Sequence, residues 1–328
     1  MTKMTGLGTF PFTSAFSPVD FDKAARILDA YFEAGGRYID VAPTYGFGSI
    51  ESFLGEYLAD KPRESFIVST SCGYVRDGDS FKVSGKYEDV MKDLEESLDR
   101  LKLDYLDIYI SHIPDLNTPF GETASALQKV MENGSAKKIG VSNVTDEQLI
   151  EYAEHADIKV VQNRLSYINR SVSQRMQTTL DEIGAEFVAY QVIERGLLTT
   201  RGPRLKADND LRHRKPEFEK SAIEEIRSFV VNELKGLVEP YGMSTEEIVV
   251  RWALSQSYVG IAQMGATEVE DAIKIAKWSE PLPSKLLNEV DELYKIANEN
   301  LQLNEKSGFR QVMGLDTYDV RSGSASGK

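Results

Sequence analysis

Apolar and polar positions alternate with two different periods along most of the chain. Short apolar runs, typical of buried strands, are each followed by a stretch in which apolar residues recur every three or four positions, as in an amphipathic helix. The predicted strands are residues 6–10, 38–42, 66–71, 106–112, 138–142, 160–165, 186–192 and 259–265. Strands that alternate with helices indicate a parallel sheet covered by helices.

Residue types at the helix ends help to place the helical stretches. Ser17 followed by Pro18 predicts a helix start, with the serine as N-cap and the proline at the first helical position. Thr145 and Gln148 have the spacing of a capping box. Further helices are predicted at 87–103, 121–133, 172–183 and 222–238.

The number of predicted strands favours a closed (β/α)8 barrel of the TIM type over an open, doubly wound α/β sheet. No change of composition and no linker rich in Pro, Gly or Ser divides the chain. We therefore predict a single domain at 1–315, followed by a flexible tail at 316–328. In such a barrel, catalytic groups lie at the carboxyl ends of the strands and on the loops that follow them.

Composition narrows the class of protein. Of the 328 residues, 41% are hydrophobic and 27% are charged, as in ordinary soluble globular proteins. The net charge of −14 argues against nucleic acid or an anionic membrane surface as a partner. A single cysteine cannot form an internal disulfide and fits a reducing, cytoplasmic setting. No apolar run reaches the length of a membrane span, and the first residues lack the apolar core of a signal peptide.

The predicted strand ends carry polar side chains that an ordinary buried strand lacks. These residues are Asp40, Tyr45, His112, Ser142, Asn143, Gln162, Tyr190 and Gln191. Each of them alone is typical of a core residue whose polar groups have hydrogen-bond partners within the protein. Because the strand ends of one barrel converge on one mouth, together they predict a small-molecule site.

Several of these residues stand in longer blocks that follow one another in a fixed order. The blocks are Asp40-Val41-Ala42-Pro43-Thr44-Tyr45-Gly46, Glu51 with Leu54-Gly55, Glu95-Glu96-Ser97-Leu98-Asp99-Arg100-Leu101, Asp104-Tyr105-Leu106-Asp107 with His112 and Pro114-Asp115, Gly140-Val141-Ser142-Asn143 and Arg195-Gly196-Leu197-Leu198. In these blocks the chain resembles the aldo-keto reductase superfamily, and the match extends from Gly6 to about Asn300.

The resemblance implies a (β/α)8 barrel that binds NADPH in an extended pose, and the chain has no G-x-G-x-x-G motif between a strand and a helix. In the family, hydride passes from the nicotinamide to a carbonyl carbon while a tyrosine protonates the oxygen. The tyrosine belongs to a catalytic tetrad of the family, and by position it is Tyr45. Two further members of the tetrad match His112, which polarises the carbonyl, and Asp40, which is the acid. An ordinary tyrosine has a pKa of about 10, so its surroundings must be tuned for this chemistry.

The resemblance also implies contacts to the cofactor. Ser142, Asn143 and Gln162 match the residues that hold the nicotinamide carboxamide, and Tyr190 matches the aromatic residue that stacks on the ring. Further contacts are implied at Gln191, Gly265 and Thr267.

The chain departs from the family at the fourth tetrad position, where Ser71 replaces a lysine. Without that cation Asp40 loses its partner, and we expect the pKa values of Asp40 and Tyr45 to rise. Lys82 and Lys86 are close in sequence, but they would have to supply the missing charge from a loop.

The cofactor segment departs as well. Glu194 and Glu268 place negative charge where a dinucleotide phosphate would lie, and Ile275 stands where the family often has an asparagine. A basic cluster after the seventh predicted strand is either a solvated loop or a lid. As a lid it would attract phosphate or an anionic substrate, such as a phosphorylated or nucleotide-linked sugar. The cluster comprises Arg201, Arg204, Lys206, Arg212, Arg214 and Lys215.

Other reactive side chains are expected to be structural. Cys72 would point away from the mouth if Ser71 points into it, which predicts a buried thiol. The three histidines lack the spacing of metal ligands, so no metal site is predicted, and His155 is expected on the surface.

Three kinds of function are compatible with these residues. The first is a reductase of a small, polar, sugar-like carbonyl compound that uses NADPH and belongs to carbohydrate metabolism. The alternative is a redox-neutral lyase, dehydratase or isomerase in which Tyr45, His112 and an Asp40 of raised pKa exchange protons without hydride transfer. The third is a binding or regulatory protein built on an inactive barrel. The substrate, the choice between NADPH and NADH, and the oligomeric state are not fixed by the sequence.

Overall fold

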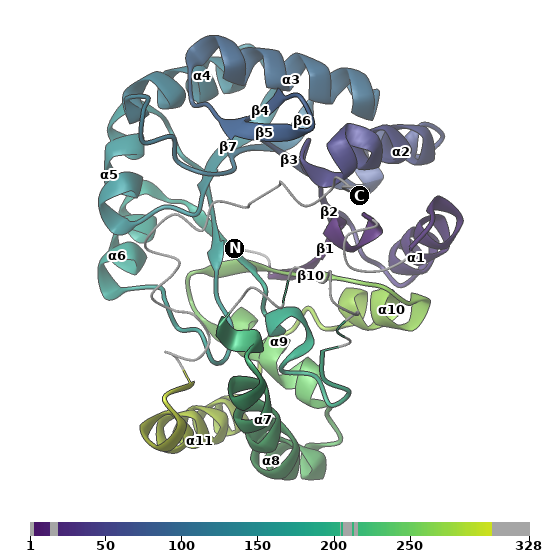
Figure 1. Ribbon diagram of the computed structural model, residues 1–328, viewed down its shortest axis with the longest axis vertical. Coiled ribbons are helices and arrows are strands. Elements are labelled where there is room, and N and C mark those ends of the chain that lie inside the picture. The colour runs from purple at the N-terminus through teal and green to yellow at the C-terminus, as the bar shows by residue number, and fades with distance from the viewer. Residues whose placement is uncertain (1–2, 14–18, 204, 206–211, 213–215, 304–328) are drawn as a thin grey trace, which may run out of the picture.

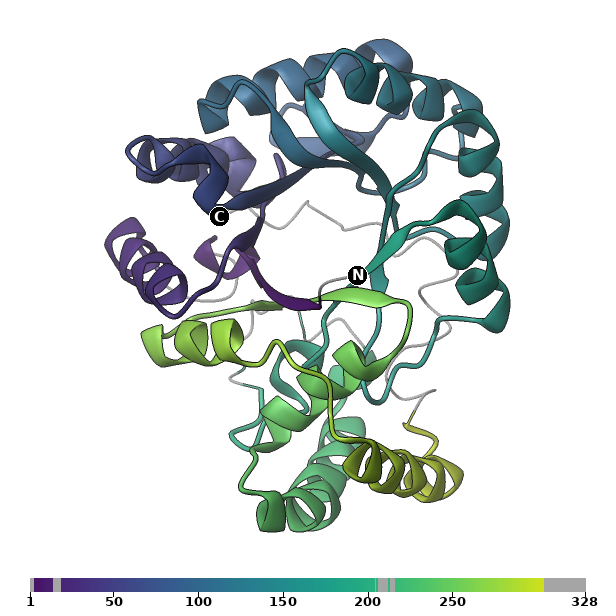
Figure 2. The ribbon, with the colours of Figure 1, turned by 180° about the vertical axis from the view of Figure 1, so that it is seen from behind.

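The (β/α)8 barrel predicted from the sequence is confirmed. The computed structural model describes residues 3–13, 19–203, 205, 212 and 216–303. In that part of the chain, eight parallel strands form a closed barrel, and the helices lie around its outside (Figures 1 and 2). The barrel strands are β1 (Met4–Gly8), β2 (Tyr38–Asp40), β3 (Ile67–Cys72), β6 (Leu106–Ser111), β7 (Ala136–Ser142), β8 (Val160–Arg164), β9 (Glu186–Tyr190) and β10 (Val259–Gly265).

Neighbouring barrel strands follow the order of the chain, and β1 closes the barrel because it pairs with both β2 and β10. In the register of these pairs, Gly6 lies between Tyr38 and Gln263. Parallel neighbours need crossover connections, which helices supply. The helices are α1 (Phe21–Glu33), α2 (Ser49–Leu58), α3 (Tyr87–Leu101), α4 (Phe120–Glu132), α5 (Asp146–His155), α6 (Gln174–Ile183), α7 (Lys220–Ser228), α8 (Lys235–Val238), α9 (Thr245–Ser255), α10 (Val269–Lys277) and α11 (Ser284–Leu301).

Each of the longer helices turns an apolar face toward the barrel. Leu28 of α1, Leu127 of α4 and Val290 of α11 have no exposed surface. Burying one such side chain stabilises the fold by about 1.5–3 kcal/mol. The layer between helices and strands is therefore the main core.

A second, smaller core fills the inside of the barrel. It consists of Tyr38, Ile108, Ile110, Val160, Val188 and Ile261. Successive side chains of a strand point to opposite faces, so the residues two positions further along these strands also point inward. This alternation places the polar residues of the strand ends in the next layer of the barrel interior, directly beyond the six apolar side chains.

The start of α1 differs from the prediction. The helix begins at Phe21, because the Asp20 carboxylate accepts a hydrogen bond from the Lys23 backbone N–H (2.7 Å) and serves as the N-cap. Ser17 and Pro18 lie outside the described residues. The capping box at Thr145 and Gln148 is confirmed.

Two further features were not predicted. The helix expected at 222–238 consists of α7 and α8 separated by a π-helical segment, Phe229–Leu234, which a hydrophobic period does not distinguish from an α-helix. A hairpin of β4 (Tyr74–Asp77) and β5 (Ser80–Val83) follows β3, and Gly78 in its turn has φ +63°. Its strands are too short and exposed to give a clear apolar alternation.

The predicted tail, residues 316–328, lies outside the described residues. None of the helices in the described part of the chain combines the length and the apolar character that crossing a membrane requires.

Candidate active site

A layer of polar side chains lies two residues further along the strands than the apolar side chains that fill the barrel. Asp40 follows Tyr38, His112 follows Ile110, Gln162 follows Val160, Tyr190 follows Val188 and Gln263 follows Ile261 at this spacing. Each is at or near the carboxyl end of its strand, where TIM-type barrels carry their active sites.

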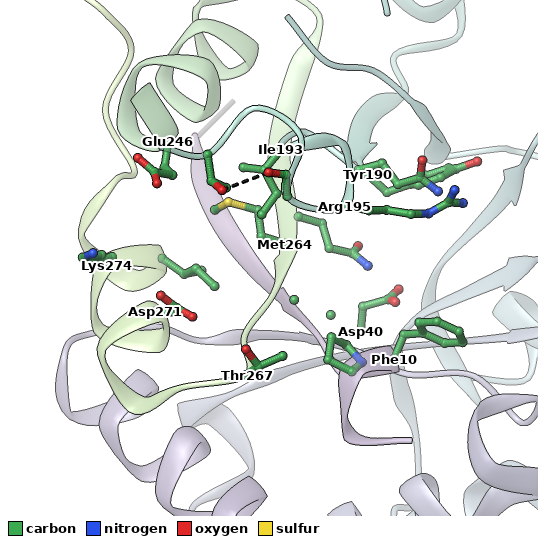
Figure 3. Close-up of a pocket in the computed structure, with 18 of the residues that line it drawn as sticks. Phe10, Asp40, Tyr190, Ile193, Arg195, Glu246, Met264, Thr267, Asp271 and Lys274 are labelled. Carbon is green, nitrogen blue, oxygen red and sulfur yellow. Dashed lines mark hydrogen bonds between the residues drawn. The ribbon is translucent and has the colours of Figure 1, made fainter. Parts of the chain in front are cut away.

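A cavity of about 400 Å³ opens at this end of the barrel. Every site residue predicted from the sequence lines it except Ser71; the lining residues among them are Asp40, Tyr45, His112, Ser142, Asn143, Gln162, Tyr190, Gln191, Gly265 and Thr267. Figure 3 shows Asp40 and Phe10 on one side of the cavity and Glu246, Asp271 and Lys274 on the other. The cavity thus extends from the barrel centre to helices α9 and α10.

Asp40 is buried among amide groups. Its Oδ2 accepts a hydrogen bond from Gln162 Nε2 (2.9 Å), which lies 3.0 Å from Gln263 Oε1. Burial raises the pKa of Asp40 to about 7, although the hydrogen bonds from Gln162 and Gln263 oppose this rise. Lys82 and Lys86 are exposed and do not line the cavity, so the structure does not bring either of them to Asp40.

His112 is the second ionisable group of the cavity. Its Nδ1 lies 2.9 Å from the hydroxyl oxygen of Ser71, and the ring of Tyr74 from the hairpin packs edge-on against it. Burial lowers the pKa of His112 to about 4, so the imidazole is neutral near pH 7. Ser71 is therefore in the site, but behind the histidine.

Tyr45 begins the short 3-10 segment that follows β2, Tyr45–Gly48. Its backbone N–H donates to the Ala42 carbonyl (2.9 Å), and the edge of its ring packs against Phe10, with centroids 5.1 Å apart. The next residue, Gly46, has φ +59°, a conformation that glycine adopts without steric cost. This tight turn holds the tyrosine at the cavity wall.

Asn143 links the histidine to the predicted cofactor residues. Its Nδ2 donates to the His112 carbonyl (2.8 Å), and its Oδ1 accepts a hydrogen bond from the Tyr190 hydroxyl. The Ser142 hydroxyl accepts a bond from the same Asn143 Nδ2 (3.1 Å) and donates to the Gln162 carbonyl (2.7 Å). The four residues expected around a nicotinamide are thus joined in one network.

One observation fits a dinucleotide in this cavity. Gln191 Oε1 is buried and has no hydrogen-bond partner among the described residues, so it can accept a bond from an amide. At Gly265 a Cβ atom would lie 2.3 Å from the Pro11 side chain, so glycine is what lets the end of β10 pack this closely on Pro11. Thr267 follows it on the same wall.

The expectation that Glu194 repels a phosphate is wrong. Its carboxylate is buried and forms an ion pair with Arg164, whereas its neighbours Ile193 and Arg195 line the cavity. Glu268 lines the cavity, but Lys23 Nζ lies 2.9 Å from its carboxylate. Pairing with these cations reduces the negative charge that an anionic ligand would meet.

The basic cluster lies partly within the described residues. Arg201 and Arg212 line the cavity, as does Arg195 just before them. The other four predicted members, Arg204, Lys206, Arg214 and Lys215, lie outside the described residues.

Sequence reasoning missed several contributors to the site, among them Gln263, Phe10, Arg195 and Tyr74. Gln263, Phe10 and Arg195 line the cavity, and Tyr74 packs on His112. Gln263 had a usable signal, since it is a lone amide in an apolar strand, as Asp40 is a lone acid.

The remaining reactive residues lie apart from the cavity. Cys72 is buried in the outer core, which confirms that it points away from the mouth, and His155 is exposed as expected. Within the described ranges, no group of three or more His, Cys, Asp or Glu side chains is placed to hold a metal ion.

Comparison with known proteins agrees with this architecture. The sequence model of the aldo/keto reductase family matches residues 5–295. An NADH-specific methylglyoxal reductase from Escherichia coli (strain K12) is 29% identical over 257 residues, 74% of this chain and 78% of the relative. An L-galactose dehydrogenase from Arabidopsis thaliana is 32% identical over 207 residues, 60% of this chain and 64% of the relative.

Among solved structures, a glycerol dehydrogenase from Gluconobacter oxydans superposes with a TM-score of 0.80 at 29% identity, covering 89% of this chain and 91% of that one. The family match spans nearly all of the barrel. The chain therefore belongs to the aldo/keto reductase family, whose members are oxidoreductases that generally use NAD(P)H.

Proposed function

We propose that the protein reduces the carbonyl group of a small, polar, sugar-like substrate with NADPH. The observation that carries the proposal is the convergence of Tyr45, His112 and Asp40 on one cavity. The same cavity holds the Asn143-centred network. The names of the relatives support a small polar substrate, since they refer to methylglyoxal, L-galactose and glycerol.

The three residues divide the chemistry between them. Bound NADPH would supply the hydride. Tyr45 gives a proton to the carbonyl oxygen, and the neutral His112 donates a hydrogen bond to the same oxygen and polarises the carbonyl. Burial raises the pKa of Asp40 to about 7, so the charge of its carboxyl determines the electrostatic potential that the other two residues experience.

Preference for NADPH is part of the proposal and rests on arginine. Arg195, Arg201 and Arg212 lie on the segment after β9 and line the cavity. A guanidinium binds phosphate through two parallel hydrogen bonds, so these residues suit the extra phosphate of NADPH or an anionic group on the substrate. As part of the same proposal, the domain extends over 1–315 and works in the cytoplasm, where reducing conditions keep Cys72 a free thiol.

A binding titration followed by turnover tests the proposal. NADPH and NADH are titrated while intrinsic fluorescence is recorded, and the complex is then mixed with small α-oxoaldehydes and aldoses while nicotinamide absorbance is followed. We expect saturable binding, tighter for NADPH, and one cofactor oxidised for each carbonyl reduced. Absence of binding at millimolar cofactor would refute it.

A redox-neutral lyase, dehydratase or isomerase is the second candidate. It is favoured by one observation: Asp40 lines the cavity with a buried carboxyl held by an amide hydrogen bond, and burial raises its pKa to about 7. Turnover of a hydroxy-carbonyl compound without nicotinamide, lost in Tyr45→Phe, would establish it. An absolute requirement for NADPH would exclude it, and any turnover that depends on Tyr45 would exclude a purely regulatory protein.

A further inference from the structure

Ser71 and Tyr74 contact the imidazole of His112, and Asn143 holds its backbone. The Ser71 hydroxyl oxygen lies 2.9 Å from its Nδ1, and the ring of Tyr74 packs edge-on with the centroids 5.3 Å apart. Asn143 Nδ2 donates to the backbone carbonyl of the histidine (2.8 Å). Of these contacts, the one at Nδ1 bears on which ring nitrogen carries the proton.

A neutral imidazole has one N–H donor and one acceptor nitrogen. Because burial lowers the pKa of His112 to about 4, the ring is neutral at physiological pH and has two possible tautomers. In one, the Ser71 hydroxyl donates to Nδ1 and Nε2 carries the hydrogen. In the other, Nδ1–H donates to Ser71 and Nε2 is an unprotonated base.

The surroundings of Ser71 select the first arrangement. The residue is buried, and within the described part of the chain His112 Nδ1 is the hydrogen-bond partner of its hydroxyl. If the hydroxyl accepted a bond from Nδ1–H, its own hydrogen would be buried without an acceptor. A buried donor without a partner is costly, whereas a lone pair left unused on an oxygen is tolerated more readily.

We infer that Ser71 is a positioning residue that holds His112 as the Nε2–H tautomer, so that the histidine presents a hydrogen-bond donor to the cavity. His112 lines the cavity and Ser71 does not, so Ser71 acts through the imidazole.

The catalytic consequence rests on the proposed function, because a donor at Nε2 polarises a carbonyl whereas an unprotonated Nε2 would remove a proton. The serine thus favours the reductase chemistry over the redox-neutral one. It does so from the position at which the family places a lysine, with a hydrogen bond in place of a positive charge.

Nitrogen NMR of the histidine side chains tests the inference directly. The full chain is labelled with ¹⁵N-histidine, and the signals of His112 are identified by their loss in His112→Gln. We expect a protonated Nε2 and an unprotonated Nδ1 in the wild type, the same pattern in Ser71→Thr, and increased Nδ1–H in Ser71→Ala. A protonated Nδ1 in the wild type would overturn the inference, as would an unchanged tautomer ratio in Ser71→Ala.

Kinetics provide the second readout. Ser71→Ala is expected to lower kcat for carbonyl reduction about tenfold with the KM for NADPH unchanged, and Ser71→Thr to restore most of the rate. Ser69→Ala is the matched control, because it removes a buried hydroxyl from the same face of β3 that makes no hydrogen bond to His112. If the wild type reduces no carbonyl, the proposed function fails, while the NMR spectrum still decides the tautomer.

Discussion

Arg164 and Glu194 form an ion pair in the interior of the protein, beside the cavity but not facing it. Both side chains are buried, and the Ser166 hydroxyl donates to the other oxygen of the same carboxylate. The residues on either side of Glu194, Ile193 and Arg195, line the cavity. The fold therefore turns the carboxylate of Glu194, which would repel a phosphate, toward the interior. It leaves Arg195 at the cavity wall.

Removing the cation of this pair should destabilise the protein. In Arg164→Met the buried carboxylate of Glu194 loses its positively charged partner, which costs about 3–5 kcal/mol of unfolding free energy. Arg175→Met is the control, since its pair with Glu147 is exposed and should contribute about 1 kcal/mol or less. Urea denaturation of both variants measures the difference. Equal, small losses would contradict the account of a buried pair.

Tyr45→Phe should separate cofactor binding from catalysis. The phenyl ring keeps the packing on Phe10 but cannot give a proton to the carbonyl oxygen. We expect kcat to fall roughly 100- to 10,000-fold, while the Kd for NADPH changes little. Steady-state kinetics and a fluorescence titration of the same preparation provide the two numbers. A kcat close to that of the wild type would remove Tyr45 from the proton-donor role.

Asp40→Asn should stabilise the protein at neutral and higher pH. Burial raises the pKa of Asp40 to about 7 from 3.8, so between these values the folded protein holds a proton that the unfolded chain has lost. The contribution of Asp40 to the stability of the wild type therefore falls as the pH rises from about 4 to about 7.

The asparagine variant does not lose stability in this way. Its free energy of unfolding should exceed that of the wild type by on the order of 1 to 4 kcal/mol above pH 7, and the difference should disappear below pH 4. Unfolding free energies of both proteins across this range test the prediction. Asp93, whose pKa is also raised to about 7 by burial, contributes equally to both proteins and cancels in the difference. An advantage independent of pH would show that Asp40 does not titrate in this window.

Arg201→Ala should weaken the binding of NADPH more than the binding of NADH. Arg201 lines the cavity on the segment after β9, and one lost contact to a phosphate corresponds to about 1.5–3 kcal/mol, or roughly 10- to 100-fold in Kd. Lys129→Ala, which removes an exposed cation on α4, is the control and should leave both constants unchanged. Equal weakening of the two cofactors would place Arg201 away from the additional phosphate.

The barrel and part of its mouth could be predicted from strand period, whereas the roles of the cavity residues were implied only by the resemblance to the family. Eight apolar runs alternating with helical stretches define the barrel, and a polar residue two positions beyond an inward apolar residue, as at Asp40 and Gln162, belongs to its mouth. The same rule places Gln263, which was overlooked although it lies at the corresponding position of β10.

What could not be predicted depends on contacts between distant segments. The direction in which Glu194 points is set by Arg164, thirty positions earlier in the chain. Whether Ser71 faces solvent, Asp40 or His112 is likewise decided by the packing of β3 against β6, which no local pattern encodes. The start of α1 was misplaced because Ser17-Pro18 and Asp20 are both good helix starts, and the structure uses the second.

The most direct test of the central claim is a single-turnover experiment with enzyme in excess over NADPH and a small α-oxoaldehyde as substrate. The account predicts that the wild type oxidises the bound NADPH completely, with one alcohol formed per cofactor, and that Tyr45→Phe binds the cofactor but leaves it reduced. Unchanged nicotinamide absorbance with the wild type, while the same preparation converts a hydroxy-carbonyl substrate without any cofactor, would contradict it.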